Sequence, residues 1–438
     1  MTTPSNPGTP HRVLVLGGGY TGLMAAIRTA RRTRRSGGRV TLVNPSGRFT
    51  ERLRLHQLAT GQQLADHRIA DLLAGTGVAF VQGRATAIRA DRREVAVETA
   101  DGSRVLAYDT LVHATGSVCD TGAVPGADTH AYTFDDAAAA LELAGRLPAI
   151  AAVGGTVAVC GGGLTGVETA AEIAESWPGL RVELLSRDVP AAMLGERARG
   201  YLERVLERLG VRVRTGAEVV KVLPDGVALA GGGYVPADAV VWTTGVRVPA
   251  LAADAGLTTD SRGRIVTDPT LRSVSHPSVY AVGDAAAVGQ AYGVVHGTCQ
   301  SGIPTAVYAA DAISRRLAGR EPRPFRFGYV HQPVSLGRLD AVIQFTHGDD
   351  TPRRWYLTGR AAVAYKESVS SSPLPAFRMS RRYVIPARAM WTRGGSRNRP
   401  ASRPSGSQCR DRKGSPSRGT SDGTRSGVRS PGPAGVWR

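Results

Sequence analysis

The sequence predicts an α/β fold built from two three-layer domains, each with a parallel β-sheet. Two glycine-rich loops carry this prediction, LGGGYTG at residues 16–22 and CGGGLTG at residues 160–166. Both have the spacing G-x-G-x-x-G, both follow a short apolar strand, and both open a helix rich in small residues. A strand, such a loop and a helix in this order are typical of a dinucleotide-binding unit. We therefore expect two Rossmann-like domains.

The elements around the loops fit two such units. Residues 78–106 and 211–236 alternate apolar and polar side chains, so we expect an antiparallel excursion in each unit. Gly37-Gly38 ends the first helix. Apolar strands are expected at 13–16, 40–43, 110–114 and 181–185, helices at about 164–177 and 298–317, and tight turns at Asp101-Gly102, Thr115-Gly116, Thr244-Gly245 and Gly283-Asp284.

This order predicts that the second nucleotide-binding domain is inserted in the first. The first domain is expected at 11–125 and 250–325, and the inserted domain at 126–249. A small C-terminal α+β region with short strands and a glycine-rich bend is expected at 326–383. Residues 384–438 are poor in apolar side chains and are expected to form a disordered basic tail.

Composition narrows the function classes. The net charge is +19, but residues 388–438 hold twelve Lys and Arg against two Asp, so more than half of the excess lies in the tail and nucleic-acid binding is not expected. No apolar run reaches the roughly 20 residues that span a bilayer, and the N-terminus lacks the pattern of a secretory signal. We expect a cytoplasmic protein. The four cysteines are far apart and the nine histidines do not cluster, so neither a dithiol nor a metal site is expected.

The glycines of the two loops have distinct expected roles. The first of each, Gly17 and Gly161, permits a tight turn, and the second, Gly19 and Gly163, lets the backbone approach a pyrophosphate. The third packs the helix against its strand, so that phosphates lie on the positive helix N-terminus. The third glycines are Gly22 and Gly166, and the neighbours expected to share the contact are Tyr20, Thr21 and Thr165.

The second strand of each unit ends where the adenosine ribose should lie. In the first unit this residue is Asn44, which keeps one hydrogen-bond acceptor but lacks the charge of the more usual acid. In the second unit the strand ends at Ser186-Arg187. A small hydroxyl followed by a cation can accept the 2′-phosphate of NADPH, whereas the alternative interpretation is a solvated arginine.

The ordered motifs together resemble the two-dinucleotide-binding-domain flavoproteins of the pyridine nucleotide-disulfide oxidoreductase superfamily. They are the two glycine loops, YDTLVHATG (108–116), WTTG (242–245) and VYAVGD (279–284). Within that group, GRFTERLRLHQLATG (47–61), the loop with Glu168 and TCQSG (298–302) are most similar to type II NADH dehydrogenases and apoptosis-inducing-factor-like quinone reductases. The likeness covers about residues 11–370. Asn44, Ser186-Arg187 and the chain after Tyr383 depart from the pattern.

The resemblance implies FAD in the first domain and NADPH or NADH in the second. It also implies that a helix starting near Thr298 supports the flavin. Lys366 is a candidate cation near the ring or the acceptor, or else an exposed lysine. The residues implied for FAD are Gly17, Gly19, Gly22, Asn44, Ala85, Thr115, Gly116, Gly283, Asp284 and Gln300, and those implied for the nicotinamide side are Gly161, Gly163, Gly166, Glu168 and Gly245.

The expected activity is FAD-dependent oxidation of NAD(P)H, because a hydride can pass from nicotinamide to flavin without a protein base. The electrons would go to a quinone or a soluble electron carrier, with contact at the inner membrane face left open. Two alternatives remain, a ferredoxin-type reductase and a non-enzymatic flavin- or nucleotide-sensing protein. The oligomeric state stays undetermined.

Overall fold

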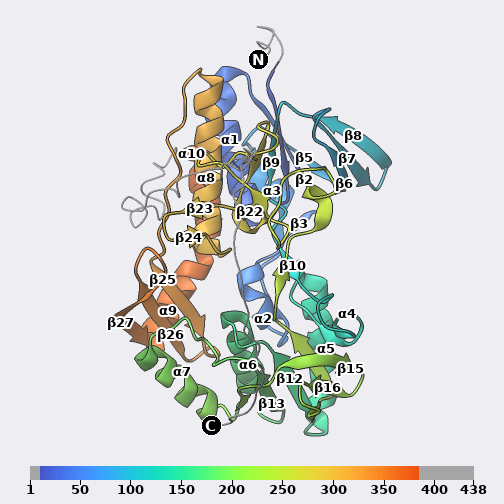
Figure 1. The fold of residues 1–438 in the computed structure, drawn as a ribbon, viewed down its shortest axis with the longest axis vertical. Coiled ribbons are helices and arrows are strands. Elements are labelled where there is room, and N and C mark those ends of the chain that lie inside the picture. The colour runs from blue at the N-terminus through green and yellow to red at the C-terminus, as the bar shows by residue number, and fades with distance from the viewer. Residues whose placement is uncertain (1–9, 384–438) are drawn as a thin grey trace, which may run out of the picture. The chain divides into compact units, whose positions relative to one another are not determined.

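The computed structural model describes residues 10–383, and the side chain of Cys299 is outside that description. Its centre is formed by two five-stranded sheets in which all strands run parallel (Figure 1). The first sheet has the order β21-β9-β1-β2-β5, with bounds Val279–Ala281, Thr110–His113, Arg12–Leu16, Arg39–Asn44 and Val78–Gln82. The second has the order β11-β18-β12-β13-β14, with bounds Ala131–Tyr132, Ala239–Trp242, Thr156–Cys160, Arg181–Leu185 and Arg212–Arg214.

The second sheet shows why the fold has three layers. Alternate residues of a strand point to opposite faces. Val157 and Val159 of β12 pack in one core, with helices α5 (Ala137–Ala152) and α6 (Leu164–Ser176). Ala158 and Cys160 pack in the other core, with the antiparallel strands β15, β16 and β17. These strands span Val219–Leu223, Gly226–Leu229 and Tyr234–Pro236.

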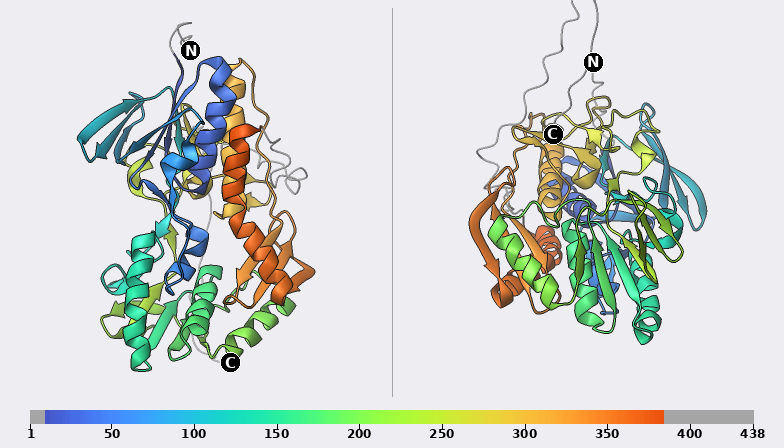
Figure 2. Two further views of the ribbon diagram at one scale, coloured as in Figure 1. Left: turned by 180° about the vertical axis from the view of Figure 1, so that it is seen from behind. Right: turned by 60° about the horizontal axis from the view of Figure 1, so that its bottom comes forward.

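The first sheet is covered in the same manner. Helix α1 (Tyr20–Thr33) lies beside α8 (Cys299–Leu317), as Figures 1 and 2 show from two sides. The guanidinium of Arg28 on α1 is buried and bonds to both carboxylate oxygens of Asp311 on α8, at 2.9 and 2.8 Å. The antiparallel strands β6, β7 and β8 (Arg84–Arg89, Glu94–Thr99 and Gly102–Ala107) contribute Ile88, Val95 and Val97 to the same core.

Two short strands connect the two sheets, and several short elements surround them. The chain passes from the first sheet to the second and back through β10 (Val118–Cys119) and β19 (Val246–Arg247), which pair with each other. The remaining helices include α2 (Leu55–Leu58), α3 (Ile69–Leu73), α4 (Ala127–His130) and α7 (Glu196–Arg208). Three further pairs of short strands are β3 with β4 (Arg48–Phe49, His67–Arg68), β20 with β22 (Ile265–Val266, Ala286–Ala287) and β23 with β24 (Gly289–Gln290, Gly293–Val294).

Both excursions begin later than the alternation of residues suggested. Residues 78–82 form β5, which pairs in parallel with β2, and residues 212–214 form β14, which pairs in parallel with β13. The antiparallel strands start only at Arg84 and Val219. Alternation arises because each of these edge strands has one exposed face, and an edge strand of a parallel sheet shows the same pattern as a strand of a hairpin.

The C-terminal region contains an antiparallel sheet and two helices. The sheet comprises β25, β26 and β27 (His331–Ser335, Ala341–Thr346 and Pro352–Thr358), and the helices are α9 and α10 (Gly359–Ser371 and Pro373–Arg382). Strands and helices together agree with the α+β region expected here, but the bounds of α9 and α10 could not be predicted, because the segment is rich in serine and holds two prolines. Within residues 10–383, no helix is both long and apolar enough to cross a bilayer. The tail expected at 384–438 lies outside the described residues.

Helix α10 returns to the first sheet (Figure 2, left). Its Phe377 is fully buried and meets the ring of Phe49 edge-on at 5.9 Å, and Phe49 in turn meets Tyr20 of α1 at 5.0 Å. A guanidinium nitrogen of Arg31 on α1 donates to the carbonyl of Arg381, at 3.0 Å. The last described helix is therefore part of the core around α1.

Candidate active site

The first glycine loop can be occupied only by glycine at two of its three positions. Gly17 has a φ of +103°, and a Cβ there would lie 2.3 Å from the carbonyl oxygen of Ala114. A Cβ on Gly22 would lie 1.8 Å from the carbonyl oxygen of Gly17. A Cβ on Gly19, in contrast, would meet nothing within 4 Å. The first and third glycines thus lie against neighbouring backbone, whereas the second faces open space and leaves room for a diphosphate.

The second loop repeats this geometry. Gly161 has a φ of +125°, and a Cβ on Gly166 would lie 1.9 Å from the carbonyl oxygen of Gly161. Gly163 again faces open space. The same arrangement of tight and open positions therefore occurs at both loops.

The helices that follow the loops begin without a side-chain cap. The N-cap residues are Gly19 for α1 and Gly163 for α6, neither has a side-chain hydrogen bond, and neither first turn holds an acid. No side chain therefore competes with an anion at these N-termini, and the helix dipole favours an anion there. Helix α8 differs, because Thr298 and Ser301 form a capping box at its N-terminus.

One cavity of about 1090 Å³ lies in front of the first loop and reaches the first turn of α6. The first glycine loop and the start of the helix after the second loop therefore border the same space. Of the residues expected from the sequence, the lining includes Gly17, Gly19, Tyr20, Thr21, Asn44, Thr115, Gly116, Thr165, Glu168, Gly283, Asp284, Gln300 and Lys366. The others lie outside it, namely Gly22, Ala85, Gly161, Gly163, Gly166, Ser186, Arg187 and Gly245.

Several of these side chains are already engaged by the protein. Oδ1 of Asn44 accepts from the backbone N–H of Gly18 at 2.8 Å, so Asn44 orders the loop. Asp284 accepts from the hydroxyl of Ser117 at 2.8 Å. Gln300 bridges the start of α8 and the chain before β25, because its Nε2 donates to the carbonyl of His331 at 2.9 Å and its Oε1 accepts from Val330 N–H at 2.6 Å. Ala85 itself does not line the cavity, whereas its neighbour Arg84 does.

The end of β13 lies beneath the second loop. Ser186 is buried, and a Cβ on Gly162 would lie 2.1 Å from its hydroxyl oxygen. Arg187 is 70% exposed in its side chain and contacts only its neighbour Asp188 among the ion pairs of the described chain, at 3.4 Å. An exposed guanidinium beside the loop can bind an anion.

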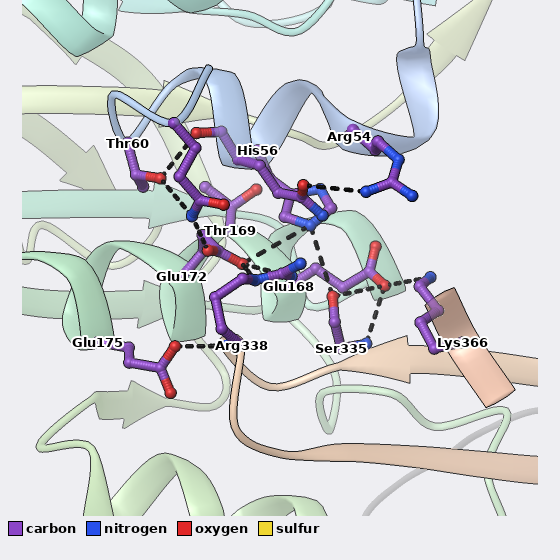
Figure 3. Close-up of polar contacts among 12 residues, drawn as sticks. Arg54, His56, Thr60, Glu168, Thr169, Glu172, Glu175, Ser335, Arg338 and Lys366 are labelled. Atoms are coloured by element: carbon purple, nitrogen blue, oxygen red, sulfur yellow. Dashed lines mark hydrogen bonds and ion pairs between the residues drawn. The ribbon is translucent and has the colours of Figure 1, made fainter. Parts of the chain in front are cut away.

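Glu168 and Lys366 form a buried ion pair on the cavity wall (Figure 3). The ammonium nitrogen of Lys366 lies 2.6 Å from Oε1 of Glu168, which also accepts from the backbone N–H of Ser335 at 3.0 Å and from its hydroxyl at 3.2 Å. Burial alone would raise the pKa of Glu168, but Lys366 and the hydrogen bonds hold it below its ordinary value. Glu168 is therefore a carboxylate at neutral pH.

A second buried carboxylate lies one turn further along α6. Glu172 is fully buried, and its Oε2 accepts from Arg338 at 2.7 and 3.0 Å. His56 lies between the two carboxylates, 3.5 Å from the hydroxyl of Ser335 and 3.8 Å from Glu172. Burial lowers the pKa of His56 to about 4, so its ring is neutral at pH 7. Sequence reasoning missed His56 as a site residue, although it lies within the family-like stretch 47–61.

The two cysteine side chains that the structure describes are inert thiols. Cys119 and Cys160 are both unpaired. Burial raises the pKa of the Cys119 thiol to about 11 and that of Cys160 to about 12, so both are protonated at neutral pH. Neither has the thiolate character of a redox cysteine.

Two helix N-termini that open on one cavity, each behind a G-x-G-x-x-G turn, define a flavoprotein oxidoreductase that uses two dinucleotides. The model of one family, described as pyridine nucleotide-disulphide oxidoreductase, matches residues 11–312. The chain belongs to this family. It is an enzyme that depends on FAD and uses NAD(P)H.

Similar proteins carry related names. The chain is 31% identical over 404 residues to an NADH dehydrogenase-like protein of Mycobacterium tuberculosis, which covers 86% of this chain and 98% of that one. It is 28% identical to the demethylphylloquinone reductase of Synechocystis, over 76% of this chain and 86% of that one. It is 29% identical to a type II NADH:quinone oxidoreductase of M. tuberculosis, over 78% of this chain and 80% of that one.

Two solved structures share the fold. The sulfide:quinone oxidoreductase of Aquifex aeolicus superposes with a TM-score of 0.73 at 19% identity, over 84% of this chain and 92% of that one. The NDH2 of Plasmodium falciparum, solved with NADH, superposes with a TM-score of 0.71 at 15% identity, over 86% of this chain and all of that one. At these identities the likeness concerns the fold.

Proposed function

We propose that this chain oxidises NAD(P)H and passes the electrons to a quinone. One observation carries the proposal: the loop before α1 and the first turn of α6 border the same cavity, so a flavin and a nicotinamide held by them can meet there. FAD, when bound, accepts a hydride from the nicotinamide and gives up electrons to the second substrate. The names of the similar quinone-reducing proteins support a quinone as that substrate.

The domain assignment follows from the two loops. Residues 11–125 and 250–325 would hold FAD, with its diphosphate against the N–H groups of Gly19, Tyr20 and Thr21 at the start of α1. Residues 126–249 would hold NAD(P)H, with its diphosphate at Gly163, Leu164 and Thr165. Residues 326–383 would complete the acceptor side of the cavity.

Ser186-Arg187 supports a preference for NADPH. A buried hydroxyl and an exposed guanidinium at the end of β13 offer a 2′-phosphate a hydrogen-bond partner and a cation, and no repelling carboxylate is at Ser186.

Glu168 and Lys366 would position the substrates at the cavity wall. The ammonium group can donate to a carbonyl oxygen of the nicotinamide or the quinone while it stays paired with Glu168. Because the pair is buried and desolvated, it holds its geometry without reorganisation.

The small C-terminal sheet supports contact with the membrane in which a quinone dissolves. Trp355 of β27 and Leu339, in the loop between β25 and β26, are both 77% exposed. Arg353 and Arg354 are exposed on the same strand as Trp355. Tryptophan and arginine together favour the interface of an anionic membrane. Sedimentation with anionic vesicles would test this: Trp355→Ala should reduce the bound fraction, and Tyr234→Ala, at an exposed aromatic residue of the inserted domain, should leave it unchanged.

Anaerobic half-reactions test the function directly. We expect NADPH, and less readily NADH, to bleach the flavin absorbance of the holoenzyme. A quinone should then restore the absorbance faster than ferredoxin or oxygen does. The proposal fails if neither nucleotide bleaches the flavin or if no quinone reoxidises it, and faster reoxidation by ferredoxin would favour a ferredoxin-type reductase.

A further inference from the structure

A second polar cluster lies on the cavity wall, and the function proposed above does not use it. It consists of His296, which precedes α8, Gln332 of β25, and Asp350 in the turn between β26 and β27. One carboxylate oxygen of Asp350, Oδ2, accepts from Nε2 of Gln332 at 2.7 Å and lies 3.1 Å from Nε2 of His296. Three segments far apart in the chain therefore meet at one carboxylate.

The cluster holds features that cost stability. Asp350 has a φ of +70°, a backbone conformation that is unfavourable for a residue with a side chain. Its second oxygen, Oδ1, and the amide oxygen of Gln332 are buried without a hydrogen-bond partner in the part of the chain that the structure describes. Both oxygens are shielded from solvent although their residues line the cavity, so the carboxylate is held mainly through its other oxygen, Oδ2.

His296 is held in place on both sides. Its ring stacks on that of Tyr329, with 4.4 Å between centroids and 8° between planes. Its backbone N–H donates to the hydroxyl of Tyr329, and that hydroxyl donates to its carbonyl, both at 2.9 Å. Because Asp350 engages Nε2, Nδ1 is the nitrogen left to face a ligand. The side chain is 52% exposed, so it can exchange protons with water.

This arrangement has the elements of a proton donor. A carboxylate that holds one ring nitrogen fixes the orientation of a histidine, so that the other nitrogen can transfer a proton. The titratable and charged groups around it, on the strands and loops that pack against it or line the cavity nearby, are Asp350, Asp349, Tyr329, Tyr292, Arg264, His331 and Lys366.

We propose that His296, Asp350 and Gln332 form the subsite that receives a carbonyl oxygen of the quinone and delivers a proton to it; this inference rests on the function proposed above. Reduction of a quinone to a quinol takes two electrons and two protons. NAD(P)H supplies two electrons and one proton as the hydride. The imidazolium of His296 gives the second proton to the quinone oxygen and regains one from water. Gln332 donates to the same carboxylate and so helps to hold Asp350 against the ring of His296. His296 is thus a catalytic residue and Asp350 a positioning residue.

The test compares acceptors that need protons with one that does not. In the holoenzyme, His296→Gln should slow quinone reduction about 100-fold, which is the scale of one general acid. Ferricyanide, which takes electrons without protons, should be reduced at the wild-type rate. Asp350→Asn should lower the rate about tenfold and shift its pH profile. The matched control is His347→Gln, at an exposed histidine in the same turn.

The outcomes separate this inference from the proposed function. If His296→Gln lowers the rates of quinone and ferricyanide reduction equally, or if this variant loses FAD, the proposed subsite is wrong and the cluster serves the flavin. An unchanged quinone rate and pH profile in His296→Gln would also overturn it. If the wild-type enzyme reduces ferricyanide but no quinone at any pH, it is the proposed function that fails.

Discussion

The ammonium nitrogen of Lys366, on α9, lies 2.6 Å from Oε1 of Glu168, on α6. Nearly two hundred residues separate the two side chains in the chain. The pair joins α6 to α9, and both residues line the cavity. The pair stabilises the contact between these two segments and is also part of the candidate active site.

Removal of the cation should show both roles. Lys366→Met leaves Glu168 charged and buried, so we expect a loss of about 3 kcal/mol in the free energy of unfolding and slower NAD(P)H oxidation. The double variant Glu168→Gln/Lys366→Met should recover much of the stability and none of the activity. Urea unfolding and steady-state rates measure the two effects. Lys221→Met, at an exposed lysine of β15, serves as the control, and equal stability of both lysine variants would contradict the expectation.

Arg187 should set the choice between nucleotides. If its guanidinium meets the 2′-phosphate of NADPH, Arg187→Ala should raise the KM for NADPH about tenfold, the scale of one charge-assisted hydrogen bond. The KM for NADH should change little. Arg181→Ala, at the opposite end of the same strand, is the control. A parallel rise in both KM values would refute the NADPH assignment.

Gly17 should tolerate no side chain. Gly17→Ala forces a Cβ against the carbonyl of Ala114 at a φ of +103°, so we expect protein that folds poorly and retains no FAD. Gly37→Ala also has a positive φ, +72°, but meets open space. It should cost only about 1 kcal/mol and keep its flavin. Bound FAD per chain, measured by absorbance, distinguishes the two, and normal FAD content in Gly17→Ala would exclude the described loop.

Acid should destabilise the fold through buried histidines. Burial lowers the pKa of His56, His113 and His331 to about 4. The unfolded chain binds protons at these groups from about pH 6.5 downward, whereas the folded chain does so only near pH 4. Stability is therefore fully present above pH 6.5 and falls between pH 6.5 and 4, by an amount on the order of 3 kcal/mol for each group. His113→Asn should flatten this fall in the thermal midpoint.

A core variant controls for simple destabilisation in that experiment. Ile173→Val removes one methylene group from a fully buried side chain, which costs about 1 kcal/mol at every pH. It should lower the midpoint uniformly and keep the wild-type slope. If His113→Asn behaves in the same way, the linkage to His113 is wrong.

Helix α10 should contribute to the stability of the first domain. Phe377→Ala removes a fully buried ring between α10 and Phe49, so we expect a loss of about 3–5 kcal/mol in the free energy of unfolding. Met379→Ala, two residues away at a 48% exposed position, should cost far less. Urea denaturation compares the two, and equal midpoints would mean that α10 does not pack on α1 in solution.

The sequence predicted both glycine loops with their strands and helices, but it predicted only part of the cavity wall. Each of these units is local: strand, glycines and helix follow one another within about 30 residues, so spacing alone reveals them. The wall is assembled from distant segments. His56, Glu168, Ser335 and Lys366 come from four of them, and no periodicity links these positions. Glu168 and Lys366 were nevertheless named as site residues, Glu168 through the family resemblance, whereas His56 and Ser335 were not named. Helix α10 was not located within the expected α+β region for a similar reason, because what stabilises it is contact with α1 rather than its own propensity.

The uncapped N-termini of α1 and α6 affect the stability of the folded protein in the absence of its ligands. No side chain of the described residues caps either N-terminus. Bound nucleotide diphosphates supply the missing acceptors, so the ligands complete the secondary structure as well as the chemistry. Ligand binding to the native state alone shifts the folding equilibrium toward it. A cell short of flavin would therefore hold less of the folded enzyme, and not merely a less active one.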